Sequence, residues 1–136
     1  MFGSLDISTS ALVAQRTRMD VIAGNIANAQ AVQRADGRPG PFQRRIAILT
    51  AGDGSGGAGV HVEQVAEDQS APRMVYEPGH PLAQQTGPMK GYVAYPNVDL
   101  STEMVDAMLA SRAYEANIAA MDVTKTMMSS TLRLLA

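Results

Sequence analysis

The side chains that most often carry chemistry are scarce in this 136-residue chain. It has no cysteine, which excludes disulfides, thiolate metal sites and a cysteine nucleophile. Its two histidines, His61 and His80, lack the paired spacing of a zinc site. His61 alternates with two valines and is expected on the outward side of a strand, whereas His80 stands in a rigid proline-flanked turn. Since the serines and carboxylates also form no nucleophile-base set, we predict no catalytic residue, no metal site and no enzyme.

A glycine pattern in the middle of the chain matches the fingerprint of dinucleotide-binding loops. The three glycines are Gly52, Gly54 and Gly57, and a predicted strand precedes them. That fingerprint works only when a helix follows and holds the pyrophosphate at its N-terminus, but residues 60–62 read as a strand. We therefore predict a flexible loop over residues 51–59 and no cofactor. A small nucleotide-binding enzyme stays as the rival hypothesis, and it predicts thermal stabilisation by nucleotide.

Composition and charge exclude several classes of partner. Eleven basic and thirteen acidic residues give a formal net charge of −2, and no half of the chain is basic, so no nucleic-acid partner is expected. No stretch approaches the length of apolar sequence that crosses a bilayer, so no membrane span is expected. The first residues have no basic region before an apolar core, and we predict no cleaved signal peptide.

Proline and glycine divide the chain into three parts. All seven prolines lie within residues 39–96, and ten of the twelve glycines lie within residues 37–91. Because both residues disfavour helix interiors, helices are expected over residues 1–30 and 97–136, around a β-rich middle of residues 31–96. Short strands are predicted at 44–50, 60–65, 74–76 and 92–95. The predicted fold is mainly α with a small β insertion, in which the terminal helices pair as one antiparallel coiled-coil domain.

Both predicted helices carry apolar residues at seven-residue spacing, which is typical of helices that pack along a seam. The first helix, with Ser4 as its N-cap, is expected to span roughly 36 Å, and the second, capped within residues 98–101, roughly 52 Å. The longer helix should therefore overhang by about 15 Å and offer a natural surface between subunits. The predicted assembly seam comprises Leu5, Leu12, Met19, Ile22, Ile26, Met104, Tyr114, Ile118, Met121, Met128, Leu132 and Leu135.

Two runs of residues carry a resemblance to a known family. The run Asn25-Ile26-Ala27-Asn28 resembles the asparagine signature near the N-terminus of bacterial flagellar rod and hook proteins. The run Gly91-Tyr92-Val93-Ala94-Tyr95-Pro96-Asn97-Val98, together with residues 72–81, 103–106 and 111–117, resembles the proximal rod members of that family. We expect the asparagines of the first run to bind backbone groups at the helix end and to fix the direction in which the chain leaves.

The resemblance implies a structural role without catalysis. Such proteins pass unfolded through the flagellar type III export apparatus and assemble helically into the rod, the shaft that carries torque from the motor towards the hook. The implied location is the periplasm-spanning rod of the basal body. The implied partners are copies of the chain, the other proximal rod proteins, the rod-base adaptor and the distal rod. Another axial protein of the same family, or a soluble coiled-coil adaptor or export chaperone, remains an alternative, and a soluble adaptor predicts a stable small oligomer.

Overall fold

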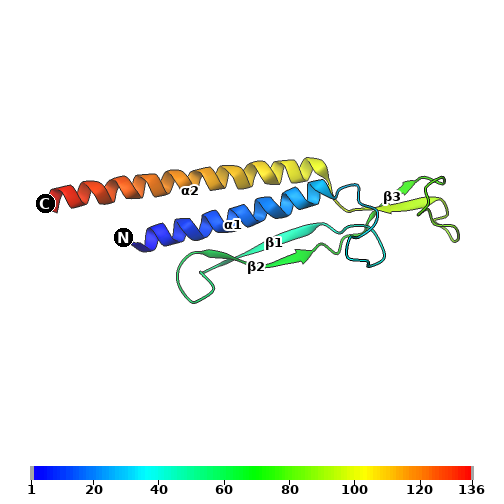
Figure 1. Ribbon diagram of the computed structural model, residues 1–136, viewed down its shortest axis with the longest axis horizontal. Coiled ribbons are helices and arrows are strands. Elements are labelled where there is room, and N and C mark those ends of the chain that lie inside the picture. Colours follow the sequence, from blue (N-terminus) through cyan, green and yellow to red (C-terminus); the bar gives the residue numbers. More distant parts are fainter. Residues whose placement is uncertain (1, 136) are drawn as a thin grey trace.

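The computed structural model describes residues 2–135 and is dominated by two long antiparallel helices (Figure 1). Helix α1 spans Phe2–Ala27, and helix α2 spans Leu100–Leu135. The helices pack side by side, so both ends of the chain lie at the same end of the molecule (Figure 1). With a small antiparallel β region between the helices, the predicted mainly α fold is confirmed.

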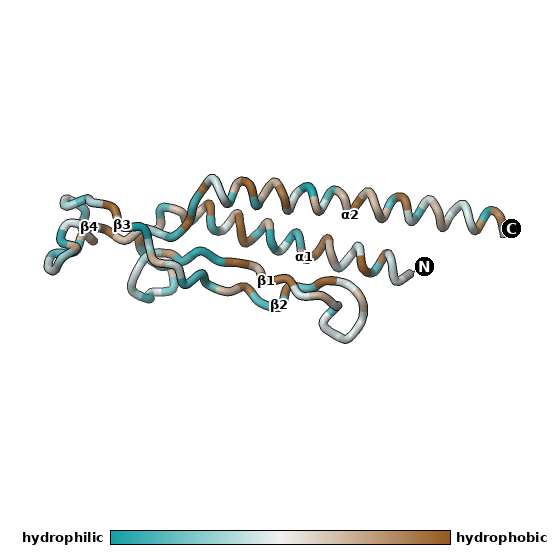
Figure 2. Tube along the Cα trace, turned by 180° about the vertical axis from the view of Figure 1, so that it is seen from behind, coloured by the Kyte–Doolittle hydropathy of each residue, from teal (hydrophilic) through white to brown (hydrophobic). Residues whose placement is uncertain are grey.

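Helix α2 extends past the start of α1. It has 36 residues against 26 in α1, and the difference of 36 − 26 = 10 residues corresponds to about 15 Å of helix. Figure 1 shows the C-terminal end of α2 beyond the N-terminal end of α1. In the hydropathy view, hydrophobic segments continue along α2 into this extension (Figure 2). The predicted overhang is therefore present, and its apolar side chains have no α1 beside them.

The starts of the two helices differ from each other in how well the sequence predicted them. Asp99 caps α2, since its carboxylate accepts hydrogen bonds from the Ser101 backbone N–H and the Thr102 hydroxyl, each at 3.0 Å. These bonds lower the pKa of the Asp99 carboxyl. The predicted cap at Ser4 is wrong, because α1 is already helical from Phe2 and Ser4 lies inside its first turn.

The first β-hairpin lies along α1, on the side away from α2 (Figure 1). It pairs β1 (Arg45–Ala51) with β2 (Val60–Glu67), with a bulge between Ile48 and Leu49. The Val60 N–H donates a hydrogen bond of 3.1 Å to the Ser10 hydroxyl of α1. Gly59 has a φ of 145°, and a side chain there would come within 2.7 Å of the same hydroxyl. The hairpin therefore approaches α1 closely at its loop end.

The second hairpin projects beyond the opposite end of the helices (Figure 1). It pairs β3 (Arg73–Tyr76) with β4 (Tyr92–Tyr95) in antiparallel register. All four predicted strands are confirmed, but they form two separate two-stranded sheets. That residues 31–96 act as one unit stays a prediction, since within the described residues only the first hairpin packs against a helix.

The apolar core of the described residues is thin. Its buried hydrophobic side chains are mostly small: Ala14, Ile22, Ala29, Ala83, Val93 and Ala110. Alanines permit close approach of backbones but bury little apolar area each. The fold therefore leaves many of the larger apolar side chains outside its own core.

Candidate functional site: an exposed helix face and a buried polar junction

The predicted seam residues of α2 fall into two adjacent rows of seven-residue spacing, and the row with Tyr114 and Met121 lies on the helix face that packs against α1. Ala107, Ala110, Tyr114 and Met121 are among the less exposed positions of α2, at spacings of three, four and seven residues. This spacing describes a single stripe along an α-helix. Tyr114 and Met121 of the predicted seam therefore contribute to the contact between the two helices.

The neighbouring predicted row is not covered by the chain itself. The exposed fractions of Met104, Ile118 and Leu132 are 56%, 40% and 66%. Met128 is half-buried, and the side chain of Leu135 lies outside the described residues. On α1, Ile22 is buried, and the other predicted seam residues are half-buried: Leu5, Leu12, Met19 and Ile26. The role of these residues between subunits stays a prediction.

The first three turns of α2 carry a dense group of exposed apolar side chains, which we name the proximal patch. It consists of Leu100, Met104, Val105, Met108 and Leu109, and the last four are each more than half exposed. Val105, Met108 and Leu109 lie on the side of α2 away from Ala107 and Ala110, and therefore away from α1. Leu100 and Met104 lie at the edge of that side. An apolar surface of this density is typical of a protein-protein contact.

The outward face of α1 has a different character. Its exposed residues include Thr9, Arg16 and Asp20, with Val13 as an isolated apolar side chain that is 62% exposed. Single apolar residues among polar ones are ordinary on a protein surface. The solvent-exposed apolar surface of the helix pair is therefore concentrated on α2.

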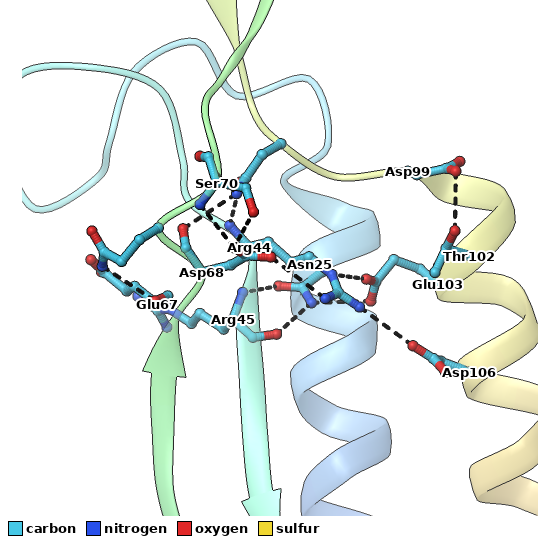
Figure 3. A network of polar contacts seen from close by, with 12 residues as sticks. Asn25, Arg44, Arg45, Glu67, Asp68, Ser70, Asp99, Thr102, Glu103 and Asp106 are labelled. Atoms are coloured by element: carbon cyan, nitrogen blue, oxygen red, sulfur yellow. Dashed lines mark hydrogen bonds and ion pairs between the residues drawn. The ribbon is translucent and has the colours of Figure 1, made fainter.

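Asn25 joins three elements at the end of the helix pair where the hairpins meet (Figure 3). Its side-chain oxygen accepts from the Arg45 N–H at 2.8 Å, and its side-chain nitrogen donates to the Arg45 carbonyl at 2.8 Å and to Glu103 at 3.0 Å. The residue is 1% exposed. One amide thus links α1 to the first residue of β1 and to the first turn of α2. Asn28, by contrast, donates to the Gly24 carbonyl at the end of α1.

The hydrogen bonds of Asn25 belong to a larger network of side chains from several elements, which we name the polar junction. Glu103 is the buried charged residue of this network. Its side chain is 0% exposed and accepts from the Arg44 Nε at 2.5 Å (Figure 3). Arg44 also lies 3.4 Å from Asp106 and 3.7 Å from Asp68. Burial lowers the pKa of Arg44, but the hydrogen bond to Glu103 and the nearby carboxylates raise it overall, so the guanidinium stays charged.

Two further side chains complete the ionic part of the junction. Arg18 of α1 lies 3.4 Å from the second oxygen of Asp106 and thus bridges the two helices. The hydroxyl and the backbone N–H of Ser70 both donate to Asp68, and with the charge of Arg44 they lower the pKa of that carboxyl. The junction therefore holds both helices and the segment that follows β2 in one network.

The second run that carries the family resemblance, residues 91–98, also contacts the polar junction. The Asn97 side-chain oxygen accepts from the Arg44 N–H at 2.9 Å, and its nitrogen donates to the carbonyls of Asp68 and Ser70. Asn25 and Asn97 therefore bind the backbone N–H groups of two consecutive residues, Arg44 and Arg45. The two runs that carry the resemblance therefore both bind the backbone of the Arg44-Arg45 dipeptide.

The rest of the second run shapes the projecting hairpin. Gly91 has a φ of 82°, and a side chain there would come within 2.7 Å of the Tyr76 ring. Tyr95 donates its hydroxyl to Glu77 at 3.1 Å, while Val93 and Pro96 are buried. These residues act on local backbone shape and packing rather than on a ligand.

Sequence reasoning missed Arg44 and the burial of Glu103. Glu103 was considered as part of a run that carries the family resemblance, and Arg44 only as the first residue of the predicted strand 44–50. The spacing of Glu103 and Asp106 was a usable signal in the sequence, because both carboxylates lie on one turn of the helix. If that turn is buried, the two carboxylates need basic partners from other elements. The chain supplies those partners from α1 and from the residue before β1.

The residues first considered for chemistry form no site in the part of the chain that the structure describes. The glycine pattern is followed by β2 and not by a helix, which agrees with the rejection of a dinucleotide site. The His61 Nδ1 lies 2.9 Å from the Gly52 carbonyl, and His80 lies within a hydrogen-bonded turn. Within residues 2–135, no cluster of three or more His, Asp or Glu side chains could hold a metal ion. No described helix is long and apolar enough to cross a membrane.

Comparison with known proteins decides the family. Residues 5–34 match the family model described as "Flagella basal body rod protein", and residues 89–134 match "Flagellar basal body rod FlgEFG protein C-terminal". The flagellar basal-body rod protein FlgC of Salmonella typhimurium is 45% identical over 95% of this chain and 93% of its own length. FlgC of Borreliella burgdorferi is 38% identical over 99% and 97%, and FlgC of Bacillus subtilis is 38% identical over 98% and 97%.

The chain belongs to the FlgC family of flagellar basal-body rod proteins. The resemblance drawn from residues 25–28 and 91–98 is therefore confirmed. The FlgC family places the chain in the rod of the basal body as a structural protein. Its relatives are named as rod proteins and not as enzymes.

Proposed function

We propose that the chain is a non-enzymatic subunit of the proximal rod and that the outward face of α2 packs against neighbouring rod subunits. The observation that carries the proposal is the proximal patch, whose last four residues, Met104, Val105, Met108 and Leu109, are each more than half exposed in the isolated chain. Water around so much apolar surface is unfavourable, and contact with another subunit removes it. The polar outward face of α1 offers no comparable gain.

A rod must transmit torque, and the polar junction supplies stiffness for this task. Asn25, Arg44 and Glu103 fix the first hairpin to both helices, and Asn97 ties the chain leading from the second hairpin to the same point. Buried polar contacts that are satisfied from several elements favour one arrangement of those elements over others. Twisting one element therefore strains the others.

The proposed partners are copies of the chain, the other proximal rod proteins, the rod-base adaptor and the distal rod. Delivery through the type III export apparatus suits a cysteine-free chain of amphipathic helices, which gain most of their stability from packing against other elements of the chain and against neighbouring subunits. A soluble coiled-coil adaptor would instead form a stable small oligomer in dilute solution, which size measurement would detect.

The test compares two valine-to-glutamate variants in a motile strain. Val105→Glu places a charge in the proximal patch, where burial of an unpaired carboxylate costs several kcal/mol, roughly the penalty for an uncompensated charge. Val13→Glu, on the outward face of α1, introduces the same charge at a site of similar exposure. We expect Val105→Glu to be exported but to leave cells without complete rods and without swimming, while Val13→Glu supports both.

The measurements are secretion, electron microscopy of basal bodies and swimming in the same strains. Normal rods with Val105→Glu would show that the outward face of α2 stays in water, and the proposed interface would then be wrong.

A further inference from the structure

The last ten residues of α2, 126–135, form a second unpartnered surface, which we name the overhang. They extend past the start of α1, and their exposed apolar side chains include Met127, Leu132 and Leu134, exposed by 65%, 66% and 87%. Met128 and Leu132 follow Met121 at intervals of seven and eleven residues, on the stripe that would face α1 if α1 were longer. A partner that covers this stripe must offer an apolar surface about as long as the overhang itself.

The proximal patch has the matching length. It runs from Leu100 to Leu109, which is ten residues and about 15 Å of helix, and the overhang is also ten residues and about 15 Å. The two surfaces lie at opposite ends of the same helix. One copy of the chain therefore cannot join them, but two copies displaced along the helix direction can.

Charge also favours contact between these two ends. At the start of α2, Glu103 and Asp106 are paired with Arg44 and Arg18 from other elements. The carboxylate of Asp99 is exposed there. The overhang has no acidic side chain and carries Arg133, with Lys125 just before it. Contact of this basic end of one copy with the exposed Asp99 carboxylate of another is an attractive arrangement.

We infer that the overhang of one copy docks on the proximal patch of a second copy of the same chain. This inference rests on the proposed function and names one of the neighbours of α2. Because the two surfaces differ, the contact is head to tail and can repeat along an open assembly. Only four or five side chains contribute on each side, so one contact buries less than the roughly 1,200 Å² of a stable pair. The isolated chain should stay monomeric, and repetition in the rod should stabilise the contact.

Disulfide cross-linking tests the contact, because the natural chain has no cysteine. A chain carrying both Met108→Cys and Leu132→Cys is produced in a motile strain, and isolated basal bodies are oxidised. We expect a ladder of two, three and more linked chains, with positions 108 and 132 joined in peptide mapping. Each single variant can link at most two chains. The control pair Thr9→Cys with Leu132→Cys, with Thr9 on the outward face of α1, should give no ladder.

The outcomes separate this inference from the proposed function. If the double variant swims and both thiols react with a maleimide, but no ladder forms, the second copy is the wrong occupant while the proposed function stands. An equal ladder from the control pair would also overturn the inference. Should the double variant fail to assemble, Leu109→Cys with Leu134→Cys provides the same comparison at the two surfaces. If Val105→Glu leaves rods intact, the proposed function fails first.

Discussion

Replacement of Glu103 by glutamine tests whether the buried junction stabilises the fold. The change keeps the size of the side chain but replaces one acceptor oxygen with an NH₂ group. Glu103 now accepts from Arg44 at 2.5 Å and from the Asn25 side chain at 3.0 Å. The Asn25 side-chain amide cannot flip in response, because its oxygen already accepts from the Arg45 N–H and its nitrogen already donates to the Arg45 carbonyl. Glutamine can therefore satisfy only one of the two donors.

The magnitude depends on which donor is left unpaired. Facing its NH₂ towards Asn25 would bury two donors against each other at a residue that is 1% exposed. Facing it towards Arg44 is less costly, since that side chain is 21% exposed and keeps Asp106 and Asp68 nearby. An unsatisfied buried donor costs about 1–3 kcal/mol, so we expect a loss of about 2 kcal/mol. With a urea slope of about 2 kcal/mol per molar, the unfolding midpoint should fall by about 1 M.

The assay is urea unfolding of the purified chain, followed by circular dichroism at 222 nm. Glu115→Gln is the matched control, because Glu115 is an exposed residue of the same helix. Its midpoint should stay within the error of the natural chain, since exposed charges contribute little to stability. A double variant with Asn25→Ala should lose less than the sum of the single losses, because the two residues share a hydrogen bond.

Equal midpoints for Glu103→Gln and Glu115→Gln would refute the reasoning. That result would mean that water or a rearranged Arg44 satisfies the glutamine at no cost, and that the junction does not hold the elements together.

Three further predictions concern the junction and the helix pair. Asn25→Ala combined with Asn28→Ala removes the bonds to β1 and to the end of α1, and should impair rod formation more than export; normal swimming would contradict this. Both Ile118→Glu and Met121→Glu should leave export intact but block rod formation, and only Met121→Glu should also lower the helicity of the isolated chain, because Ile118 is 40% exposed and Met121 is half-buried. The folded pKa of Asp68 lies below its unfolded value of about 3.8, so the stability that this carboxyl contributes is present above that pH and is lost as the pH falls through the lower folded pKa. Urea midpoints of the natural chain and of Asp68→Asn should therefore differ at pH 6 and converge towards pH 3.

The sequence alone determined the type and approximate position of every element. Helix and strand follow from local patterns: seven-residue apolar spacing and freedom from proline in the helices, and short β-branched runs between glycines and prolines in the strands. The length of each helix followed from the same patterns, and so did the overhang. The family followed from residues 25–28 and 91–98, because the amino-acid sequences of these two motifs are characteristic of the family and can be recognised without a structure.

Only the tertiary structure decided which face meets which partner. Periodicity shows that Tyr114 and Met121 share a row, but two adjacent apolar rows were available and the pattern could not choose between them. The choice is made by Ala107 and Ala110, whose small side chains let α1 approach on one side and leave the proximal patch open on the other.

The buried junction was hidden for a related reason. Glu103 is separated from Asn25 by 78 residues and from Arg44 by 59. A carboxylate at a helix start looks like a surface residue until donors from other elements arrive to satisfy it. Which donors arrive is set by the paths of α1 and β1 in space, and no spacing within α2 contains that information.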